Sequence, residues 1–318
     1  MIYSAGSRIG VRDDIPRILI IIVKCVKIDI FNYRVGVTLH NCVSKNYMIE
    51  KEMNRVVLVI GGAGYIGSHA SWLLSQQGYQ VIILDALVHQ QPVNQSWATF
   101  IQGDFGDRQL LSKIFSEYAI DTVMHFAAFI EVGESVKDPA KYYNNNVVKT
   151  IHLLDIMREY DVNKLIFSSS CAVYGNPLRL PLDEEHPTSP VSPYGRTKLM
   201  VEYALQDYAA AYGLRYVALR YFNAAGGLSA QGLGEFHKPE SHIIPILFAA
   251  ARNNTSFNIF GTNYNTLDGT CVRDYIHVLD IAHAHVQASE YLNTGAPSQI
   301  FNFGTGVGYS VKELVALA

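Results

Sequence analysis

The sequence predicts an α/β protein built on a doubly wound parallel β-sheet, followed by a second, smaller α/β domain. Three observations predict this fold: apolar runs rich in β-branched residues alternate with helix-length segments, a glycine-rich loop follows the first run, and the 318 residues suffice for about two domains. With 49% hydrophobic and 17% charged residues, the chain should fold as a globular protein. The net charge of -3 supplies no overall positive field, so we expect no nucleic-acid partner.

Five apolar runs are predicted to be strands buried on both faces of a parallel sheet. In chain order they are residues 55–60, 81–84, 122–126, 164–168 and 216–220. Four helix-length segments separate them, namely residues 68–77, 107–118, 142–160 and 193–212. Strand and helix in turn predict right-handed β-α-β crossovers, the arrangement of a Rossmann fold.

A glycine loop follows the first predicted strand and opens the first predicted helix. Glycines at 61, 64 and 67 allow the backbone to approach a pyrophosphate at the helix N-terminus. Asp85 ends the second predicted strand, 18 residues after Gly67, where a carboxylate accepts hydrogen bonds from the adenosine ribose. That carboxylate repels a ribose 2′-phosphate, and the next two residues, Ala86 and Leu87, offer no cation to hold one. The predicted cofactor is therefore NAD rather than NADP.

A tyrosine and a lysine are spaced for acid-base chemistry. Tyr194 and Lys198 are four residues apart at the start of a predicted helix, which puts the phenol and the ammonium on one face. An ordinary tyrosine has a pKa of about 10, so a base that works near pH 7 needs a lower one. A water-screened charge at 4 Å contributes only about 1 kcal/mol, so we expect the site to be buried and helped by a positive nicotinamide ring.

A hydroxyl group at the end of the fourth predicted strand completes this constellation. Ser168, Ser169 and Ser170 lie at the carboxyl edge, where open α/β sheets place their ligands. We expect Ser170 to share a sugar hydroxyl proton with Tyr194, with Ser169 as the nearest alternative. The other serines are expected to cap backbone groups at the strand end.

The chain is predicted to divide at residues 52 and 222. Residues 1–52 form an atypical N-terminal extension whose apolar run, 18–23, is far shorter than the ~20 residues that cross a bilayer. Residues 53–222 are expected to be the NAD-binding Rossmann domain. Residues 223–318 are expected to be the substrate domain, cut short at its end and partly returning to the first domain. The four cysteines form no C-x-x-C pair, which favours a reducing, cytoplasmic setting.

Six segments of the chain resemble the UDP-glucose 4-epimerase family of the extended short-chain dehydrogenase/reductase superfamily. They follow in unbroken order between Met53 and Ala318 and are residues 61–70, 125–136, 168–175, 192–198, 219–226 and 268–278. The resemblance implies an NAD-dependent interconversion of UDP-glucose and UDP-galactose through a 4-keto sugar, with Tyr194 as the base. It also implies a homodimer formed through residues 142–160 and 192–212.

The resemblance further implies a set of binding residues. For the pyrophosphate, ribose and adenine they are Gly61, Gly64, Tyr65, Ile66, Gly67, Asp85, Asp104 and Phe105. For the nicotinamide side they are Phe126, Ala127, Ala128, Asn145, Tyr194, Lys198 and Phe222. For the UDP-sugar they are Ser170 and Tyr194 at the hexose and Asn223, His242, Phe260 and Arg273 at the UDP. The planar donor fork of Arg273 independently suits a pyrophosphate.

Some alternatives stay open at this point. A 4-epimerase for another UDP-sugar, such as UDP-N-acetylglucosamine, a UDP-uronate or a UDP-pentose, would keep every residue named above. A non-catalytic NAD-binding fragment is a second alternative. A nucleotide-sugar 4,6-dehydratase is disfavoured because Cys171 and Ala172 stand where it needs an Asp-Glu pair. No metal site is expected, because His283 and His285 are two residues apart and point to different helix faces.

The sequence also departs from the family. Ile60 replaces the usual threonine before the glycines, and residues 86–89 replace an Asn-rich segment after the ribose carboxylate. Family members continue past the equivalent of Ala318 with a further arginine for the pyrophosphate and with residues that gate the sugar pocket. If the chain ends there, we expect it to keep NAD and to bind UDP-sugar more weakly.

Overall fold

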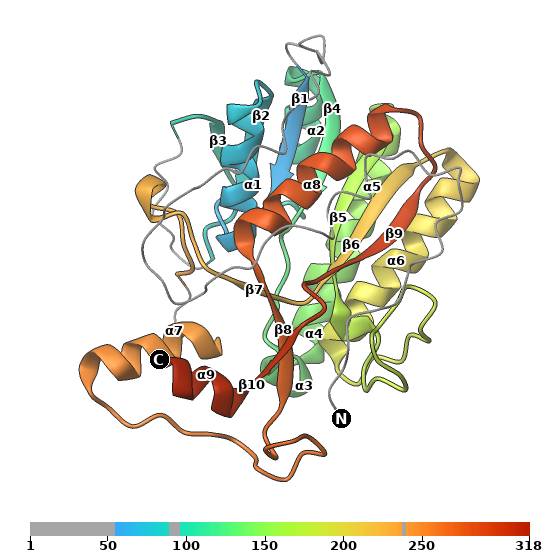
Figure 1. The fold of residues 1–318 in the computed structure, drawn as a ribbon. Coiled ribbons are helices and arrows are strands. Elements are labelled where there is room, and N and C mark those ends of the chain that lie inside the picture. The colour runs from blue at the N-terminus through green and yellow to red at the C-terminus, as the bar shows by residue number, and fades with distance from the viewer. Residues whose placement is uncertain (1–54, 89–95, 237–239) are drawn as a thin grey trace, which may run out of the picture.

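The computed structural model describes residues 55–88, 96–236 and 240–318. The predictions for residues 1–52 therefore lie outside the described residues. The described chain forms a large parallel sheet between two helical layers, with a smaller sheet below the carboxyl ends of its strands (Figure 1).

The large sheet has seven strands in the order β3-β2-β1-β4-β5-β6-β9, and every neighbouring pair is parallel. The strands are β1 (Val56–Ile60), β2 (Gln80–Asp85), β3 (Thr99–Gln102), β4 (Ile120–His125), β5 (Lys164–Ser170), β6 (Arg215–Tyr221) and β9 (Gln299–Phe303). The chain order reverses beside β1, between β2 and β4, which is where doubly wound sheets bind dinucleotides. The predicted fold class is confirmed.

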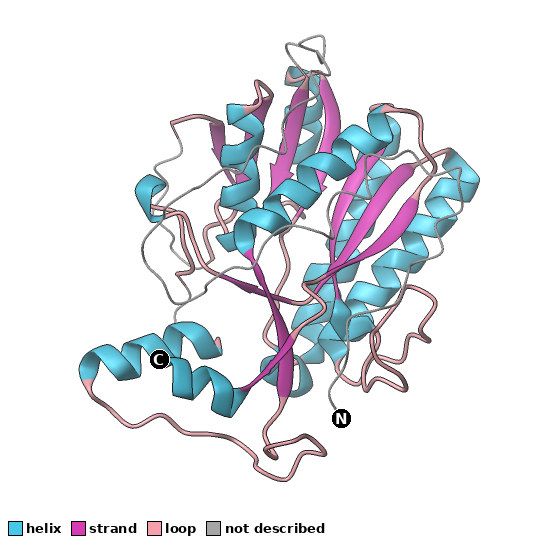
Figure 2. Cartoon of the chain, in the orientation of Figure 1, coloured by secondary structure: helices cyan, strands magenta, loops and turns pink. Residues whose placement is uncertain are grey.

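Both faces of the sheet are covered, as the apolar strands require. Within β1, Leu58 and Ile60 belong to the core under one helical layer, while Val57 and Val59 belong to the core under the other. The first layer contains α2 (Arg108–Glu117), α5 (Lys149–Glu159) and α6 (Pro193–Tyr212), and the second contains α1 (Tyr65–Gln76) and α8 (Val278–Asn293). Figure 2 shows the strands between these helices.

Three elements around the large sheet differ from the sequence prediction: the edge strands β3 and β9, which were not among the predicted strands, and one helix. The strand β3 was not predicted, because its four residues at the sheet edge lack the continuous apolar run of a central strand. The single helix predicted over residues 142–160 is broken into α4 (Pro139–Tyr142), a π-helical segment (Tyr143–Val148) and α5. The π segment contains the buried Asn146, whose amide exchanges hydrogen bonds with the backbone of Phe129 and donates to Thr197.

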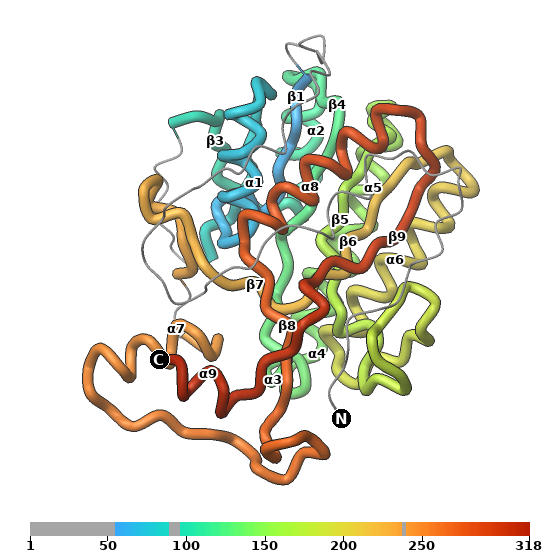
Figure 3. The backbone as a smooth tube through the Cα atoms, viewed as in Figure 1, coloured from blue at the N-terminus to red at the C-terminus, as the bar shows by residue number. Residues whose placement is uncertain are grey.

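The smaller sheet has three strands in the order β10-β8-β7. They are β7 (Asn223–Ala225), β8 (Val272–His277) and β10 (Gly308–Ser310). Beside them lie α7 (Ile243–Asn253) and α9 (Val311–Leu317), which contribute Leu247 and Leu314 to a small core. Residues 254–271 join α7 to β8 as a long connection that loops away from the molecule (Figure 3).

Short segments complete the architecture. They are α3 (Val132–Lys137), a 3₁₀ turn at Cys171–Val173 and a second 3₁₀ turn at Ser229–Gln231. After β8, the chain returns to the large sheet through α8 and β9, and β9 pairs with β6. How these units divide into domains stays a prediction.

Candidate active site

A broad cleft lies at the carboxyl edge of the large sheet and is closed on its other side by β7, β8 and the loops around them. Every predicted site residue except Phe260 lines this cleft. Phe260 lies in the long connection after α7 with its side chain 87% exposed, so the structure does not bring it to the site. A turn carries it outward, because residues 254–271 have no strand or helix to hold them against the cleft.

The glycine loop leaves no room for side chains. Gly61 has φ of 79°, and a β-carbon added there would lie 2.6 Å from the backbone nitrogen of Ala127. At Gly67 an added β-carbon would lie 2.2 Å from the carbonyl oxygen of Gly61. Gly64 caps α1 without a side-chain hydrogen bond, and the first turn of that helix carries no acidic residue. The helix N-terminus therefore faces the cleft as a site for an anion.

Asp85 ties this loop to the end of β2. Its carboxylate accepts hydrogen bonds from the backbone nitrogens of Ala63 at 3.0 Å and Leu87 at 2.8 Å. The ribose carboxylate predicted from the sequence is therefore held in a fixed orientation at the cleft. Each carboxylate oxygen keeps a further lone pair for a ribose hydroxyl.

Asp104 and Phe105 lie on the predicted adenine side of the cleft. The carboxylate of Asp104 accepts hydrogen bonds from Gly106 N at 2.7 Å and from Lys149 Nζ at 2.5 Å. Phe105 is buried and packs its ring 5.0 Å from the ring of His125. These contacts give an aromatic floor with a charged rim, which suits a nucleobase.

Tyr194, Lys198 and Ser170 come together at the cleft, as the sequence predicts. The first two are carried by α6, which begins after the N-cap Ser192, and Ser170 ends β5. Burial raises the pKa of the Tyr194 phenol to about 12, although a hydrogen bond to Ser170 acts to lower it. The phenol thus keeps its proton in the protein alone.

Lys198 is buried, with 4% of its surface exposed, and its ammonium donates to the Ser168 carbonyl oxygen at 2.7 Å. The nitrogen lies 6.0 Å from the centre of the Tyr194 ring. Burial lowers the pKa of Lys198 to about 7, against the opposing charge of Glu202. The role of Lys198 in favouring the Tyr194 phenolate stays a prediction, as does the expected help from a positive nicotinamide ring.

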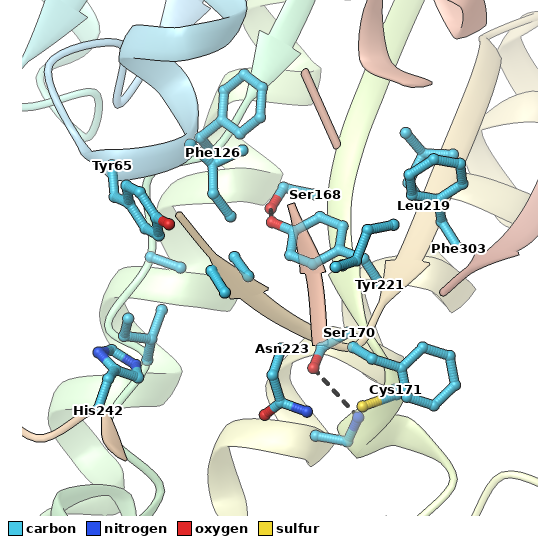
Figure 4. A pocket seen from close by; sticks show the side chains of 18 of the residues that line it. Tyr65, Phe126, Ser168, Ser170, Cys171, Leu219, Tyr221, Asn223, His242 and Phe303 are labelled. Atoms are coloured by element: carbon cyan, nitrogen blue, oxygen red, sulfur yellow. Dashed lines mark hydrogen bonds between the residues drawn. The ribbon is translucent and has the colours of Figure 1, made fainter. Parts of the chain in front are cut away.

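The three consecutive serines point to two different faces of β5. Ser168 and Ser170 face the cleft, and the Ser168 hydroxyl hydrogen-bonds the hydroxyl of Tyr221 (Figure 4). Ser169 points the other way and donates to the buried carboxylate of Glu202 at 2.5 Å. Strand alternation therefore favours Ser170 over Ser169 as the hydroxyl that meets a substrate.

The predicted UDP side of the cleft is more open. Asn223 donates to the carbonyl oxygen of Asp274 at 2.9 Å, and Arg273 is exposed, with one guanidinium nitrogen on the carbonyl oxygen of Val272. Asp274 does not pair with Arg273; it accepts hydrogen bonds from Thr305 and from the backbone of Gly306. The Arg273 guanidinium therefore keeps donors for a phosphate group.

His242 lies between two carboxylates. Its Nδ1 is 2.7 Å from Glu235 and 3.3 Å from Glu240, and the hydrogen bond to Glu235 raises the pKa of the imidazole above its ordinary value. These three residues are also the group of side chains, among the described residues, whose ligand atoms lie close enough to hold a metal ion. The expected absence of a metal site stays a prediction.

Sequence reasoning missed several residues at this site. Tyr221 lies over Ser168 in the cleft, and burial raises the pKa of its phenol. Glu202 lies one helical turn after Lys198 and pairs with Arg220. The four-residue spacing from Lys198 to Glu202 was the available signal, but spacing on a helix does not show whether a charged residue is buried.

Comparison with known proteins gives a consistent result. The family model described as "NAD dependent epimerase/dehydratase family" matches residues 57–304. The chain is 52% identical over 260 residues to a UDP-glucose 4-epimerase of Halalkalibacterium halodurans, a match that covers 81% of this chain and 78% of the relative.

Solved structures agree with it. The UDP-glucose 4-epimerase of Brucella ovis in complex with NAD is 50% identical, with a TM-score of 0.80 over 82% of this chain and 81% of that one. The UDP-glucose 4-epimerase of Stenotrophomonas maltophila, with bound NAD and formylated UDP-arabinopyranose, is 43% identical, with a TM-score of 0.78 over 82% and 81%. In the part of the chain that the structure describes, no helix is long and apolar enough to cross a membrane.

Proposed function

The chain belongs to the NAD dependent epimerase/dehydratase family and is an NAD-dependent epimerase, and we propose that it interconverts UDP-glucose and UDP-galactose with Tyr194, Lys198 and Ser170 at the reacting carbon. The observation that supports this assignment most is the meeting of the Tyr194 phenol and the Ser170 hydroxyl, beside a buried lysine, in the cleft that the glycine loop opens into.

The residues of the cleft fit NAD. Glycines 61 and 67 leave space that any side chain would fill, the N-terminus of α1 suits a pyrophosphate, and Asp85 presents a fixed carboxylate to a ribose. Phe126, Ala127 and Ala128 follow β4 and add apolar side chains to the lining of the same cleft. When bound, NAD supplies a reversible hydride acceptor and a positive ring.

Tyr194 is the proposed base. Its Oη removes the proton of the sugar 4-hydroxyl while C4 is oxidised to a ketone, and it returns a proton to that oxygen when C4 is reduced. The ring of bound NAD would add its positive charge to that of the Lys198 ammonium in favouring the Tyr194 phenolate. Ser170 is proposed to share a sugar hydroxyl proton with Tyr194, because its single O–H can donate to either oxygen and its lone pairs can accept from the other.

Inversion needs a sugar that can turn between the two half-reactions. Arg273, Asn223 and His242 are proposed to hold the UDP, with the exposed Arg273 fork on the pyrophosphate. The hexose is proposed to be held at Ser170 and Tyr194 and is expected to bind more loosely than the UDP. Since the UDP is the firmer anchor, the 4-keto sugar can present its other face, and hydride return then gives the opposite configuration with no net redox change.

A purified chain that converts UDP-galactose to UDP-glucose without added reductant would support the proposal. Tyr194→Phe keeps the ring and removes the proton-transferring oxygen, so we expect kcat to fall roughly 10³-fold or more while NAD stays bound. Undiminished turnover by Tyr194→Phe would contradict the assignment of the base.

The range of UDP-sugars is a separate point. The relative from Stenotrophomonas holds a UDP-pentose derivative, which favours testing UDP-arabinose beside UDP-galactose. Comparing kcat/KM for UDP-galactose, UDP-N-acetylgalactosamine, UDP-galacturonate and UDP-arabinose identifies the preferred substrate.

We also propose a homodimer and a cytoplasmic setting. Helix α6 presents Met200 and Tyr203 to solvent with 45% and 51% of their surface exposed, and Val148 lies at the start of the neighbouring α5 with 44% exposed. These side chains form the proposed dimer surface, and light scattering after gel filtration measures the mass that tests it. Within the part of the chain that the structure describes, Cys171 and Cys271 form no disulfide with each other, which agrees with a reducing compartment.

A further inference from the structure

Glu202 is a fully buried carboxylate that the proposed proton transfer does not use. It lies on α6 one turn after Lys198 with 0% of its surface exposed. Its Oε1 accepts from Ser169 Oγ at 2.5 Å and from Arg220 Nε at 2.9 Å, and its Oε2 accepts from Arg220 Nη2 at 2.6 Å. A buried ion pair is costly to desolvate, and apolar side chains often fill such a place at less cost. The charge therefore points to a role other than packing.

The ion pair is part of a network whose described members are all hydrogen-bonded. Arg220 Nη1 donates to the hydroxyl of Tyr174 at 2.8 Å, and that hydroxyl donates to Asn302 Oδ1 at 2.6 Å. The network thus joins α6 to β5, β6 and β9, the part of the sheet beneath the catalytic residues. Fully satisfied polar networks of this kind hold a single arrangement of the elements they join.

Ser169 connects the network to the catalytic groups. It is paired with Arg220 in the register of β5 and β6, and both side chains reach Glu202. The residues on either side of it serve the cleft: the carbonyl of Ser168 accepts from the Lys198 ammonium, and the hydroxyl of Ser170 bonds Tyr194. A bond that holds Ser169 therefore holds the backbone that places both neighbours.

Glu202 also acts on Lys198 through its charge. Besides Glu202, the titratable groups that face the ammonium are Tyr194 on the same helix and His125 on β4, and the apolar ring of Phe167 on β5 lies 5.0 Å away. Burial, together with the charge of Lys198, lowers the pKa of His125 to about 3, so this imidazole is neutral. Among these described groups, Glu202 is the one whose charge favours the protonated lysine.

We propose that Glu202 is a positioning residue that holds the end of β5 through Ser169 and places a buried carboxylate one helical turn from the Lys198 ammonium. It touches neither substrate nor cofactor in this arrangement. The inference rests on the proposed roles of Tyr194 and Lys198, and it predicts separate consequences for geometry and for charge.

The charge is tested by removing both members of the ion pair in the full chain. Glu202→Gln/Arg220→Met avoids leaving a buried arginine without its counter-ion. Competitive labelling of lysines with trace acetic anhydride, read by peptide mass spectrometry across pH, reports the protonation of Lys198 without any need for turnover. We expect the midpoint for Lys198 to move down, and the alkaline limb of kcat to move with it, by the part of the Glu202 charge that the removed Arg220 cation does not offset. An unchanged midpoint in a folded variant overturns the proposal.

The geometry is tested by Ser169→Ala, which removes the anchoring hydroxyl and keeps both charges. We expect kcat to fall about tenfold with little change in KM and no shift of the Lys198 midpoint. Ser289→Ala is the matched control, since Ser289 is a buried serine on α8 whose hydroxyl has no partner among the described residues. If the double variant fails to fold, Ser169→Ala decides, and an unchanged kcat overturns the proposal.

A failure of the proposed function would look different. If the parent chain does not turn over UDP-sugars while its Lys198 midpoint still falls in the double variant, the epimerase assignment fails and the role of Glu202 stands. If turnover and its pH limits are normal in every variant, the role of Glu202 fails and the epimerase assignment stands.

Discussion

The cleft has one wall formed by the seven-stranded sheet, which is deeply packed, and another formed by β7, β8 and β10, which is thin and exposed. In β1 every residue from Val57 to Ile60 is fully buried, whereas in β8 Val272 is 41% exposed and Arg273 is exposed beside it. Tyr65 crosses from the first wall to the second by donating to the carbonyl oxygen of Gly226 at 2.6 Å. The difference indicates that the cofactor wall is preformed, while the substrate wall has few contacts that hold its groups in place.

We expect the largest difference between the two walls in how much stability each loses in acid. Burial lowers the pKa of His69 to about 4, of His125 to about 3 and of His285 to about 4, and all three lie in the packed wall. Below pH 6.5, the ordinary pKa of histidine, these three side chains bind protons in the unfolded chain but stay neutral in the folded chain. The stabilisation is thus complete above pH 6.5 and is lost progressively as the pH falls towards 3. At pH 5.5 three such groups cost about 4 kcal/mol of unfolding free energy.

The substrate wall should respond with the opposite sign. The bond to Glu235 raises the pKa of His242, so its contribution is complete below pH 6.5 and is lost as the pH rises through the raised value. Urea unfolding at pH 7.5 and 5.5 measures the global loss, and hydrogen exchange locates it. We expect α1, β4 and α8 to lose protection at pH 5.5 before the segment around His242. Equal loss of hydrogen-exchange protection in both walls would contradict the expected difference. His285→Leu removes one of the three buried histidines and should reduce the loss of unfolding free energy at pH 5.5.

The next largest effect is expected from Lys198→Met, a change of similar length that removes the buried cation. We expect kcat to fall by roughly 10²–10³-fold, because a preorganised charge beside the reacting oxygen is lost from a water-excluded site. NAD should remain bound, since the glycine loop and Asp85 are untouched. Steady-state kinetics with UDP-galactose test this, and Lys113→Met, whose side chain is 68% exposed on α2, should behave like the parent chain.

Gly67→Ala tests how rigid the cofactor wall is. The added carbon would lie 2.2 Å from the carbonyl oxygen of Gly61, a backbone atom that cannot give way as a side chain can. We expect NAD binding to weaken about 100-fold, or roughly 2.7 kcal/mol, as measured by calorimetry. Gly133→Ala is the control, because a carbon added there meets nothing within 4 Å. Normal NAD affinity in Gly67→Ala would show that the backbone of this wall can move to make room for the added carbon.

The smallest effects are expected on the substrate wall. Arg273→Ala removes an exposed fork of donors, and we expect KM for UDP-galactose to rise about tenfold with unfolding and NAD affinity unchanged. The exposed Arg252 on α7 provides the charge control, Arg252→Ala. Phe260→Ala should alter neither constant, since that ring is 87% exposed and away from the cleft. A large loss of stability in Arg273→Ala would contradict the view that this wall is thin.

Most of the architecture was accessible from local patterns. The apolar runs predicted β1, β2, β4, β5 and β6, because a strand buried on both faces must be apolar along its length. Helix α6 begins and ends where predicted, from its N-cap Ser192 to the left-handed Gly213. The edge strand β3 and the π segment were not accessible, since each depends on which neighbours surround it.

The same division holds for the site. The glycines and Asp85 predict a dinucleotide site, because their steric and charge requirements act within a few residues of one another. The spacing of Tyr194 and Lys198 predicts a base and a neighbouring cation. It did not show that burial would raise the pKa of the phenol to about 12, because desolvation depends on segments distant in the sequence.

The sequence by itself determined the doubly wound sheet, the order of its elements and the chemical types gathered at its carboxyl edge, since periodicity and spacing are properties of neighbouring residues. The tertiary structure decided that Ser168 and Ser170 face the cleft while Ser169 faces Glu202, that Phe260 stays outside the cleft, and that Glu202 is buried against Ser169 and Arg220. These outcomes depend on the pairing of β5 with β6 and on the packing of α6. Contacts between segments far apart in the chain set how buried a side chain is, which charges lie near it and which way it points.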